Sequence, residues 1–164
     1  MQNEELQKTE WELHDIQTRY FDLYQMASIG YLILSLTSQI LETNLTAAAL
    51  LGQQRGVLIK QNFSNLIFNE DQDSFYLHTV ELFEKDDPQE YELRMVKKDG
   101  TVLWIQIAAT AAKDNGESIC RMVLSDITER KMMEFAYKRE RGKIQALIHV
   151  YGPGIGAPRN NNRL

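Results

Sequence analysis

The sequence predicts an α+β protein in which an antiparallel sheet carries helices on one face and is flanked by a long helix at each end. Three observations lead to this fold class. Residues 91–107 alternate apolar and polar side chains, and an Asn115-Gly116 hairpin signal follows them. Residues 31–43 hold two further strand-like segments ahead of a group of short helical ones. Residues 1–26 and 127–149 carry apolar side chains at heptad spacing, which is typical of helices that pair.

Composition limits the class of protein. The chain has 164 residues, a net charge of −5 and a single cysteine, Cys120. This length suffices for one domain with a core and additional helices, and the acidic balance argues against a nucleic-acid-binding surface. No apolar run approaches the roughly 18 residues of a membrane span, and the acidic N-terminus is unlike a signal peptide. A single cysteine excludes an internal disulfide framework and fits a cytoplasmic location.

Residues 1–26 are predicted to form an amphipathic helix with one apolar stripe. The stripe follows heptad spacing, and we define it as Leu6, Leu13, Ile16, Tyr20 and Leu23. This spacing favours the seam of a homodimer, with parallel helices preferred and the orientation left open. A helix folded back on its own domain is the alternative, because fewer than four heptads are present.

Two helices are expected between the strand segments. Asn44 begins a short helix over 45–51, and Gly52 ends it in the left-handed conformation. A longer helix runs from Asn69 to about Glu84.

Three strands are expected in the second half of the domain. Asp99-Gly100 and Asn115-Gly116 each predict a two-residue type I′ hairpin turn. The last strand, 118–124, leads to Asp126, which can start a helix by accepting hydrogen bonds from backbone N–H groups, with Glu129 placed to reach back. A strand therefore passes almost without a loop into the exit helix.

Several short motifs at consistent spacing resemble PAS domains of the bacterial sensory-box type, over about Tyr20 to Lys131. They are Ile29-Gly30-Tyr31, Glu42-Thr43-Asn44, Leu50-Leu51-Gly52, Lys97-Lys98-Asp99-Gly100-Thr101 ahead of Leu103-Trp104, and Ser125-Asp126-Ile127-Thr128-Glu129-Arg130-Lys131. The resemblance implies a five-stranded antiparallel sheet whose inner face and helices enclose a small pocket. It also implies that Asp126, Thr128 and Glu129 couple the sheet to an output helix.

The family's cofactors can be compared with this sequence residue by residue. Flavin photoadduct members carry an Asn-Cys-Arg loop, whereas Gln61-Asn62-Phe63 stands in that region here, which disfavours a covalent flavin adduct. Haem members place a histidine before an Asp-Ser-aromatic run, whereas Gln72 precedes Asp73-Ser74-Phe75 here and glutamine does not ligate haem iron. His78 is expected to be a structural histidine, with haem ligation as the less favoured alternative, so haem is disfavoured. The favoured expectation is no cofactor, with non-covalent flavin or a small apolar or acidic metabolite left open.

The candidate pocket residues are Leu34, Leu50, Phe63, Phe75, His78, Leu82, Trp104 and Met122. Ordinary core packing is the alternative for each, because apolar residues at these periods are buried in any domain. Trp104 is singled out because a buried indole N–H needs an acceptor, either a ligand atom or a main-chain carbonyl. Cys120 is expected to be an inert buried thiol.

The chain is expected to divide into an N-terminal helix (1–26), the PAS domain (27–131), an exit helix (132–150) and a disordered tail (151–164). We find no phosphate-binding glycine loop, metal-spaced His/Cys set or nucleophile elbow in the sequence. A catalytic output domain is therefore expected to be absent.

These observations favour a non-catalytic sensory module that belongs to, or is truncated from, a two-component sensor histidine kinase. It would relay a pocket or dimer change to the exit helix through Asp126-Ile127-Thr128. A ligand-free dimerisation or protein-interaction module is the alternative, and a flavin or haem redox or gas sensor is the third. The expected partners are a second copy, a kinase or other output domain, and a small-molecule ligand if the pocket holds one, but neither nucleic acid nor a membrane.

Overall fold

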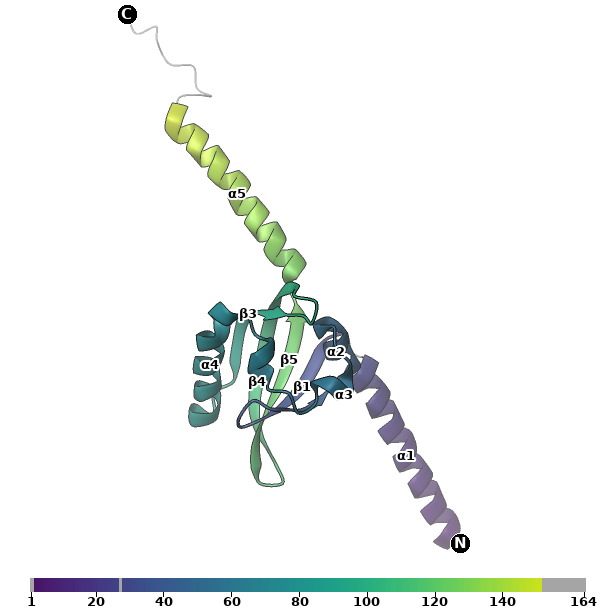
Figure 1. Ribbon diagram of the computed structural model, residues 1–164. Coiled ribbons are helices and arrows are strands. Elements are labelled where there is room, and N and C mark those ends of the chain that lie inside the picture. Colours follow the sequence, from purple (N-terminus) through teal and green to yellow (C-terminus); the bar gives the residue numbers. More distant parts are fainter. Residues whose placement is uncertain (1, 27, 152–164) are drawn as a thin grey trace, which may run out of the picture. The chain divides into compact units, whose positions relative to one another are not determined.

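The computed structural model describes residues 2–26 and 28–151 (Figure 1). Residues up to Ile127 form one compact unit, and the residues from Thr128 form a second. The elements are α1 (Gln2–Met26), β1 (Gly30–Ser35), β2 (Ile40–Thr43), α2 (Leu45–Leu51), α3 (Arg55–Leu58), η1 (Phe63–Leu66), η2 (Asn69–Asp71), α4 (Gln72–Lys85), β3 (Gln89–Val96), β4 (Val102–Asp114), β5 (Glu117–Asp126) and α5 (Thr128–Tyr151). Residues 152–164 of the predicted tail lie outside the described residues.

The first unit is built on a five-stranded sheet with the strand order β2-β1-β5-β4-β3. Every neighbouring pair is antiparallel, so the predicted fold class is confirmed. The short helices α2, α3 and α4 lie against one face of the sheet, which we call the inner face (Figure 1). We call the opposite face the outer face.

The hydrophobic core lies between the inner face and these helices. Strand side chains alternate between the two faces, so every second residue of each strand enters the core. The buried strand residues include Leu32, Leu34, Leu93, Met95, Ile105, Ile107, Met122 and Leu124, and the helices and their connections contribute Ala47, Leu51, Leu58, Phe63, Phe75 and Leu82. Removal of this apolar surface from water is the main driving force for the fold.

Three local predictions are confirmed in the backbone. Asn44 caps α2, because its side chain accepts a hydrogen bond from the Ala47 N–H. Gly52 ends α2 with a left-handed φ of 68°. Asn115 and Gly116 have φ values of 52° and 82° between β4 and β5, as a type I′ turn requires.

The expected two-residue turn at Asp99-Gly100 is wrong. β3 ends at Val96 and β4 begins at Val102, so the loop is longer. Gly100 has a φ of 90°, but Asp99 does not enter the left-handed region that a type I′ turn needs at both positions. The Asp99 side chain instead accepts a hydrogen bond of 2.9 Å from the Thr101 N–H, and this local bond favours the wider loop.

Candidate functional site

The inner face holds most of the predicted pocket residues in one cluster. Leu34, Phe63, Phe75, Leu82 and Met122 are buried there, and Leu50 is partly buried against the same core. The rings of Phe63 and Phe75 lie 5.3 Å apart. The structure brings these residues together, but their side chains contact one another rather than surround an open space.

A cavity of about 10 Å³ remains between α4 and the inner face. Leu34, His78, Leu82 and Met122 line it, whereas Leu50, Phe63 and Phe75 do not. This volume admits about one water molecule. Organic cofactors such as flavin or haem occupy pockets of roughly 300 Å³ or more, so neither group fits this cavity in the conformation described.

His78 is held by a stack and a hydrogen bond. Its ring lies 3.8 Å from that of Tyr91 at an interplanar angle of 1°. Its Nδ1 lies 2.8 Å from Oε1 of Gln89, whose Nε2 donates to the main-chain oxygen of Asp87. Oε1 is therefore the acceptor, and Nδ1 of His78 carries the proton. These contacts give His78 a structural role on the cavity wall.

Two groups that line this cavity, the partly buried Tyr91 and the buried Cys120, are held in their neutral forms. Burial raises the pKa of Tyr91, and burial raises the pKa of the Cys120 thiol to about 12. The thiolate is the reactive form of cysteine, so Cys120 lacks the lowered pKa of a reactive thiol.

Gln72, the first residue of α4, also has a structural role. Its amide donates to the main-chain oxygens of Ser64 at 2.7 Å and Ile67 at 2.9 Å. The side chain therefore joins the start of α4 to η1.

The prediction that Trp104 lines the inner pocket is wrong. It alternates with the buried residues Leu103 and Ile105 along β4, so its side chain lies on the outer face and not among the inner cluster. The guanidinium carbon of Arg94 lies 5.2 Å from the Trp104 ring and 4.5 Å from the Phe68 ring. The indole is thus part of a cation–π arrangement at the β3 edge.

Arg94 also forms an ion pair that sequence reasoning missed. Its Nε and Nη2 donate to the Asp71 carboxylate at 2.9 and 2.7 Å, and its main-chain N–H donates to the same carboxylate at 2.7 Å. These bonds lower the pKa of Asp71 and raise that of Arg94. The start of α4 is therefore joined to β3 and, through Arg94, to Trp104.

The junction between the sheet and the exit helix is one residue long. β5 ends at Asp126, α5 begins at Thr128, and Ile127 alone separates them. The Ile127 N–H donates to the main-chain oxygen of Trp104 at 2.9 Å, and Ile127 is only 7% exposed. Of the predicted coupling residues, Asp126 is the last residue of β5, and Thr128 and Glu129 are the first two residues of α5.

Each terminal helix exposes its heptad stripe within this chain. On α1, Leu6, Leu13 and Ile16 are 59%, 55% and 63% exposed. On α5, Met133 and Tyr137 are also exposed. Such continuous apolar stripes are typical of helices that bury them against another helix.

The end of α1 is attached to the sheet by one buried side chain. Oδ1 of Asn44 accepts hydrogen bonds from the N–H groups of Tyr31 at 2.9 Å and Ala47 at 3.0 Å. Its Nδ2 donates to the main-chain oxygens of Tyr24 at 2.7 Å and Ile29 at 3.1 Å. The side chain therefore acts as a helix cap and also joins α1, β1 and α2.

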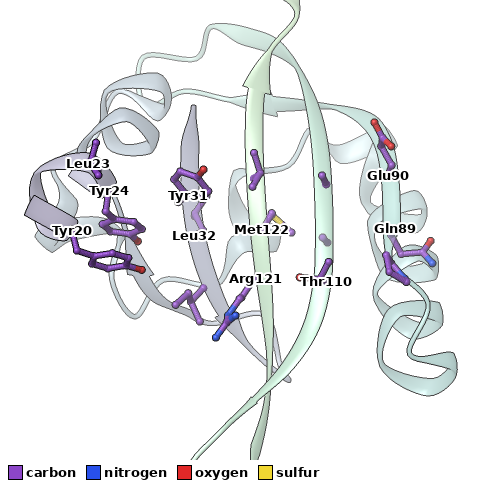
Figure 2. A pocket seen from close by; sticks show the side chains of 15 residues that line it. Tyr20, Leu23, Tyr24, Tyr31, Leu32, Gln89, Glu90, Thr110, Arg121 and Met122 are labelled. Carbon is purple, nitrogen blue, oxygen red and sulfur yellow. The ribbon is translucent and has the colours of Figure 1, made fainter. Parts of the chain in front are cut away.

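An open groove of about 800 Å³ lies between the last turns of α1 and the outer face, and we call it the outer groove (Figure 2). Its lining comprises Tyr20, Leu23 and Tyr24 of α1, Tyr31, Leu32 and Ile33 of β1, Arg121, Met122 and Val123 of β5, Ala108, Ala109 and Thr110 of β4, and Pro88, Gln89 and Glu90 at the start of β3. Two residues of the predicted dimer seam, Tyr20 and Leu23, thus face this groove. Their spacing on α1 predicts an apolar stripe, but it does not indicate that the outer face of the sheet lies opposite these two residues.

Three tyrosine rings form one wall of the outer groove. The rings of Tyr20 and Tyr24 are 6.4 Å apart at 5°, and those of Tyr24 and Tyr31 are 5.8 Å apart at 27°. The Tyr24 hydroxyl is buried without a hydrogen-bond partner among the described residues. Burial, with a further contribution from the Glu42 carboxylate, raises the pKa of Tyr24 to about 12, so this hydroxyl stays protonated.

Comparison with known proteins gives a consistent result. A family model described as PAS domain matches residues 28–129. The PAS domain of an HTR-like protein from Haloarcula marismortui has a TM-score of 0.66 and 17% identity, covering 74% of this chain and 99% of that one. A sensory box histidine kinase/response regulator from Burkholderia thailandensis has a TM-score of 0.63 and 21% identity, covering 78% and 98%. At these identities the structural likeness shows the fold alone.

A PAS domain from a two-component sensor histidine kinase is also similar, with a TM-score of 0.59 and 16% identity over 69% of this chain and 98% of that one. A search of curated protein sequences finds no match. Within residues 2–26 and 28–151, no helix has both the length and the apolar character that crossing a membrane requires.

Proposed function

Because the chain belongs to the PAS domain family, we propose that it is the non-catalytic sensory module of a cytoplasmic two-component sensor histidine kinase. In this proposal residues 27–131 sense a change, residues 1–26 pair two copies, and the exit helix over 132–150 carries the change to a kinase or other output domain. The similarity to PAS domains of sensor histidine kinases supports this assignment of the output class.

The observation that carries the proposal is the junction at Ile127. A single buried residue, bonded to β4, separates the last strand from α5. A displacement of β4 or β5 would therefore move the first residue of the helix, because no flexible loop absorbs it. Couplings of this kind are typically about 1–3 kcal/mol, which is enough to change an output several-fold.

A fusion through Tyr151 to the dimerisation and catalytic segments of a histidine kinase would test the relay. Ala109→Leu overfills the small cavity, which Ala109 lines, and is expected to change autophosphorylation several-fold. Ala112→Leu, the same substitution on the same strand away from that cavity, is the matched control. Insertion of Gly-Gly between Ile127 and Thr128 should abolish the response to Ala109→Leu. An unchanged response after the insertion would refute the relay.

We propose further that the chain forms a homodimer through the α1 stripe of Leu6, Leu13, Ile16, Tyr20 and Leu23. Leu13→Asp places a charge in this stripe and should weaken the dimer about tenfold or more in sedimentation equilibrium. Trp11→Asp changes another exposed apolar residue of α1, outside the stripe, and should have little effect. Equal effects of the two substitutions would exclude the stripe as the seam.

A ligand-free interaction module is the second candidate, and the inner cavity of about 10 Å³ favours it. In that case dimerisation itself would be the signal. Native mass spectrometry of freshly purified protein distinguishes the two candidates, because a retained small molecule adds its mass to the chain.

A further inference from the structure

The outer groove is formed by a single copy of the chain. Its α1 wall is held by the hydrogen bond from Asn44 to the main-chain oxygen of Tyr24, and by the stack of the Tyr24 ring on Tyr31. The strands on the other side are fixed by the sheet itself. A preformed groove loses less entropy when a ligand binds than a groove that must be assembled.

The floor of the groove combines an apolar surface with a positive charge near the α1 wall. Ile33, Ala108 and Val123 alternate outward on three adjacent strands and form the apolar part. Arg121 lies on the same face, and its guanidinium makes no ion pair or hydrogen bond with the described residues. Glu90, on β3 at the far side of the groove, accepts a hydrogen bond of 2.8 Å from the neutral amide of Gln106 and keeps its negative charge. Of these two charges, the positive one of Arg121 lies nearer the α1 wall in Figure 2.

From this arrangement we infer that the outer groove binds a small amphipathic organic anion. Its carboxylate pairs with the Arg121 guanidinium, whose planar donors match a carboxylate in bidentate geometry. Its aromatic or aliphatic body covers the apolar floor and lies against the wall of Tyr20 and Tyr24, whose hydroxyls point towards the strands in Figure 2. The assignment goes beyond the proposed function, since it gives a ligand class and a site on the face opposite the inner cavity.

The inference is tested with two probes of the same shape, 1-naphthoate and its neutral analogue 1-naphthamide. Each is titrated into the full chain while the amide resonances of residues such as Ile33, Ala108 and Val123 are followed by NMR. The expected result is saturable binding of 1-naphthoate with a dissociation constant of about 1 mM or below, centred on these amides. The amide analogue should bind roughly tenfold more weakly.

Two substitutions, with a third as control, separate the charge from the shape of the groove. Arg121→Gln should weaken 1-naphthoate roughly tenfold and leave 1-naphthamide unchanged. Lys98→Gln removes one positive charge in the distant β3–β4 loop and should change neither. Ala108→Leu fills the floor and should abolish binding of both probes. Equal effects of Arg121→Gln and Lys98→Gln, or normal binding by Ala108→Leu, would overturn the inference.

A second copy of the chain is the competing occupant of the groove, because Tyr20 and Leu23 belong both to the α1 stripe proposed as the dimer seam and to the groove wall. The titration is therefore repeated at protein concentrations below and above the dimer midpoint. Equal affinity at both concentrations supports the small-anion site. Affinity that falls as the dimer forms would show that the partner covers the groove, and the inference would fail. The readout needs no kinase, so its outcome is independent of the relay proposed above.

Discussion

The side-chain amide of Asn44 donates a hydrogen bond of 2.7 Å to the main-chain oxygen of Tyr24, so one buried residue fixes the end of α1. Asn44→Asp keeps the oxygen that caps α2 but replaces the donor by a second oxygen facing two carbonyls. We predict a loss of about 2 kcal/mol or more in unfolding free energy, measured by denaturant titration. Amide exchange in the last turn of α1 should also become faster.

If Asn44 served only as the N-cap of α2, Asn44→Asp would leave the unfolding free energy nearly unchanged, because Asp and Asn are equally good N-caps. Asn62→Asp is the control, since Asn62 also caps a helical turn but donates its amide to the exposed Thr37 carbonyl. If Asn44→Asp costs no more than Asn62→Asp, then Asn44 does not hold α1.

The ion pair between Asp71 and Arg94 predicts a pH dependence of stability. The pKa of Asp71 is lowered in the folded chain, so its contribution is fully present above pH of about 4 and is lost as the pH falls through the folded pKa. Asp71→Asn should cost about 1–2 kcal/mol at pH 7. Its difference from the unmodified chain should shrink as the pH is lowered from 5 towards 2.

Thermal unfolding at a series of pH values measures this difference. Asp114→Asn, at the exposed end of β4, serves as the control for loss of a carboxylate. A difference between Asp71→Asn and the unmodified chain that stays constant down to pH 2 would contradict the ion-pair assignment.

Gly30 lies where β1 passes close to Ala47 of α2. A Cβ atom there would lie 3.0 Å from Cβ and 3.1 Å from Cα of Ala47, and 3.4 Å from Cβ of Leu124. Gly30→Ala should therefore destabilise the domain by about 1–3 kcal/mol, measured by denaturant unfolding. Gly56→Ala in α3 meets nothing within 4 Å and should be neutral or slightly stabilising. If the two variants have equal unfolding free energies, α2 can move away from β1 without loss of stability.

Features that depend on neighbouring residues were predictable from the sequence. The Asn44 cap, the Gly52 terminus and the Asn115-Gly116 turn each follow from local backbone chemistry. The predicted type I′ turn at Asp99-Gly100 is wrong, because the hydrogen bond from the Thr101 N–H to the Asp99 side chain competes with the tighter hairpin.

Features that depend on distant partners were not predictable. Asp71 and Arg94 are 23 residues apart, and nothing local marks them as a pair. The same limit applies to the bond from Asn44 to Tyr24 and to the outer groove, which exists only once α1 lies beside the sheet. The prediction that Trp104 lines the pocket rests on its indole, whereas the alternation along β4 indicates that it lies on the face opposite Leu103 and Ile105.

The relay from the sheet to α5 is tested most directly by hydrogen exchange of residues 128–136, with and without Gly-Gly between Ile127 and Thr128. With the natural junction, we predict that Ala109→Leu changes the exchange of these amides as well as that of α4. With the insertion, Ala109→Leu should still change exchange in α4 but no longer in residues 128–136. If the start of α5 responds equally in both proteins, or in neither, the one-residue junction does not transmit the state of the sheet.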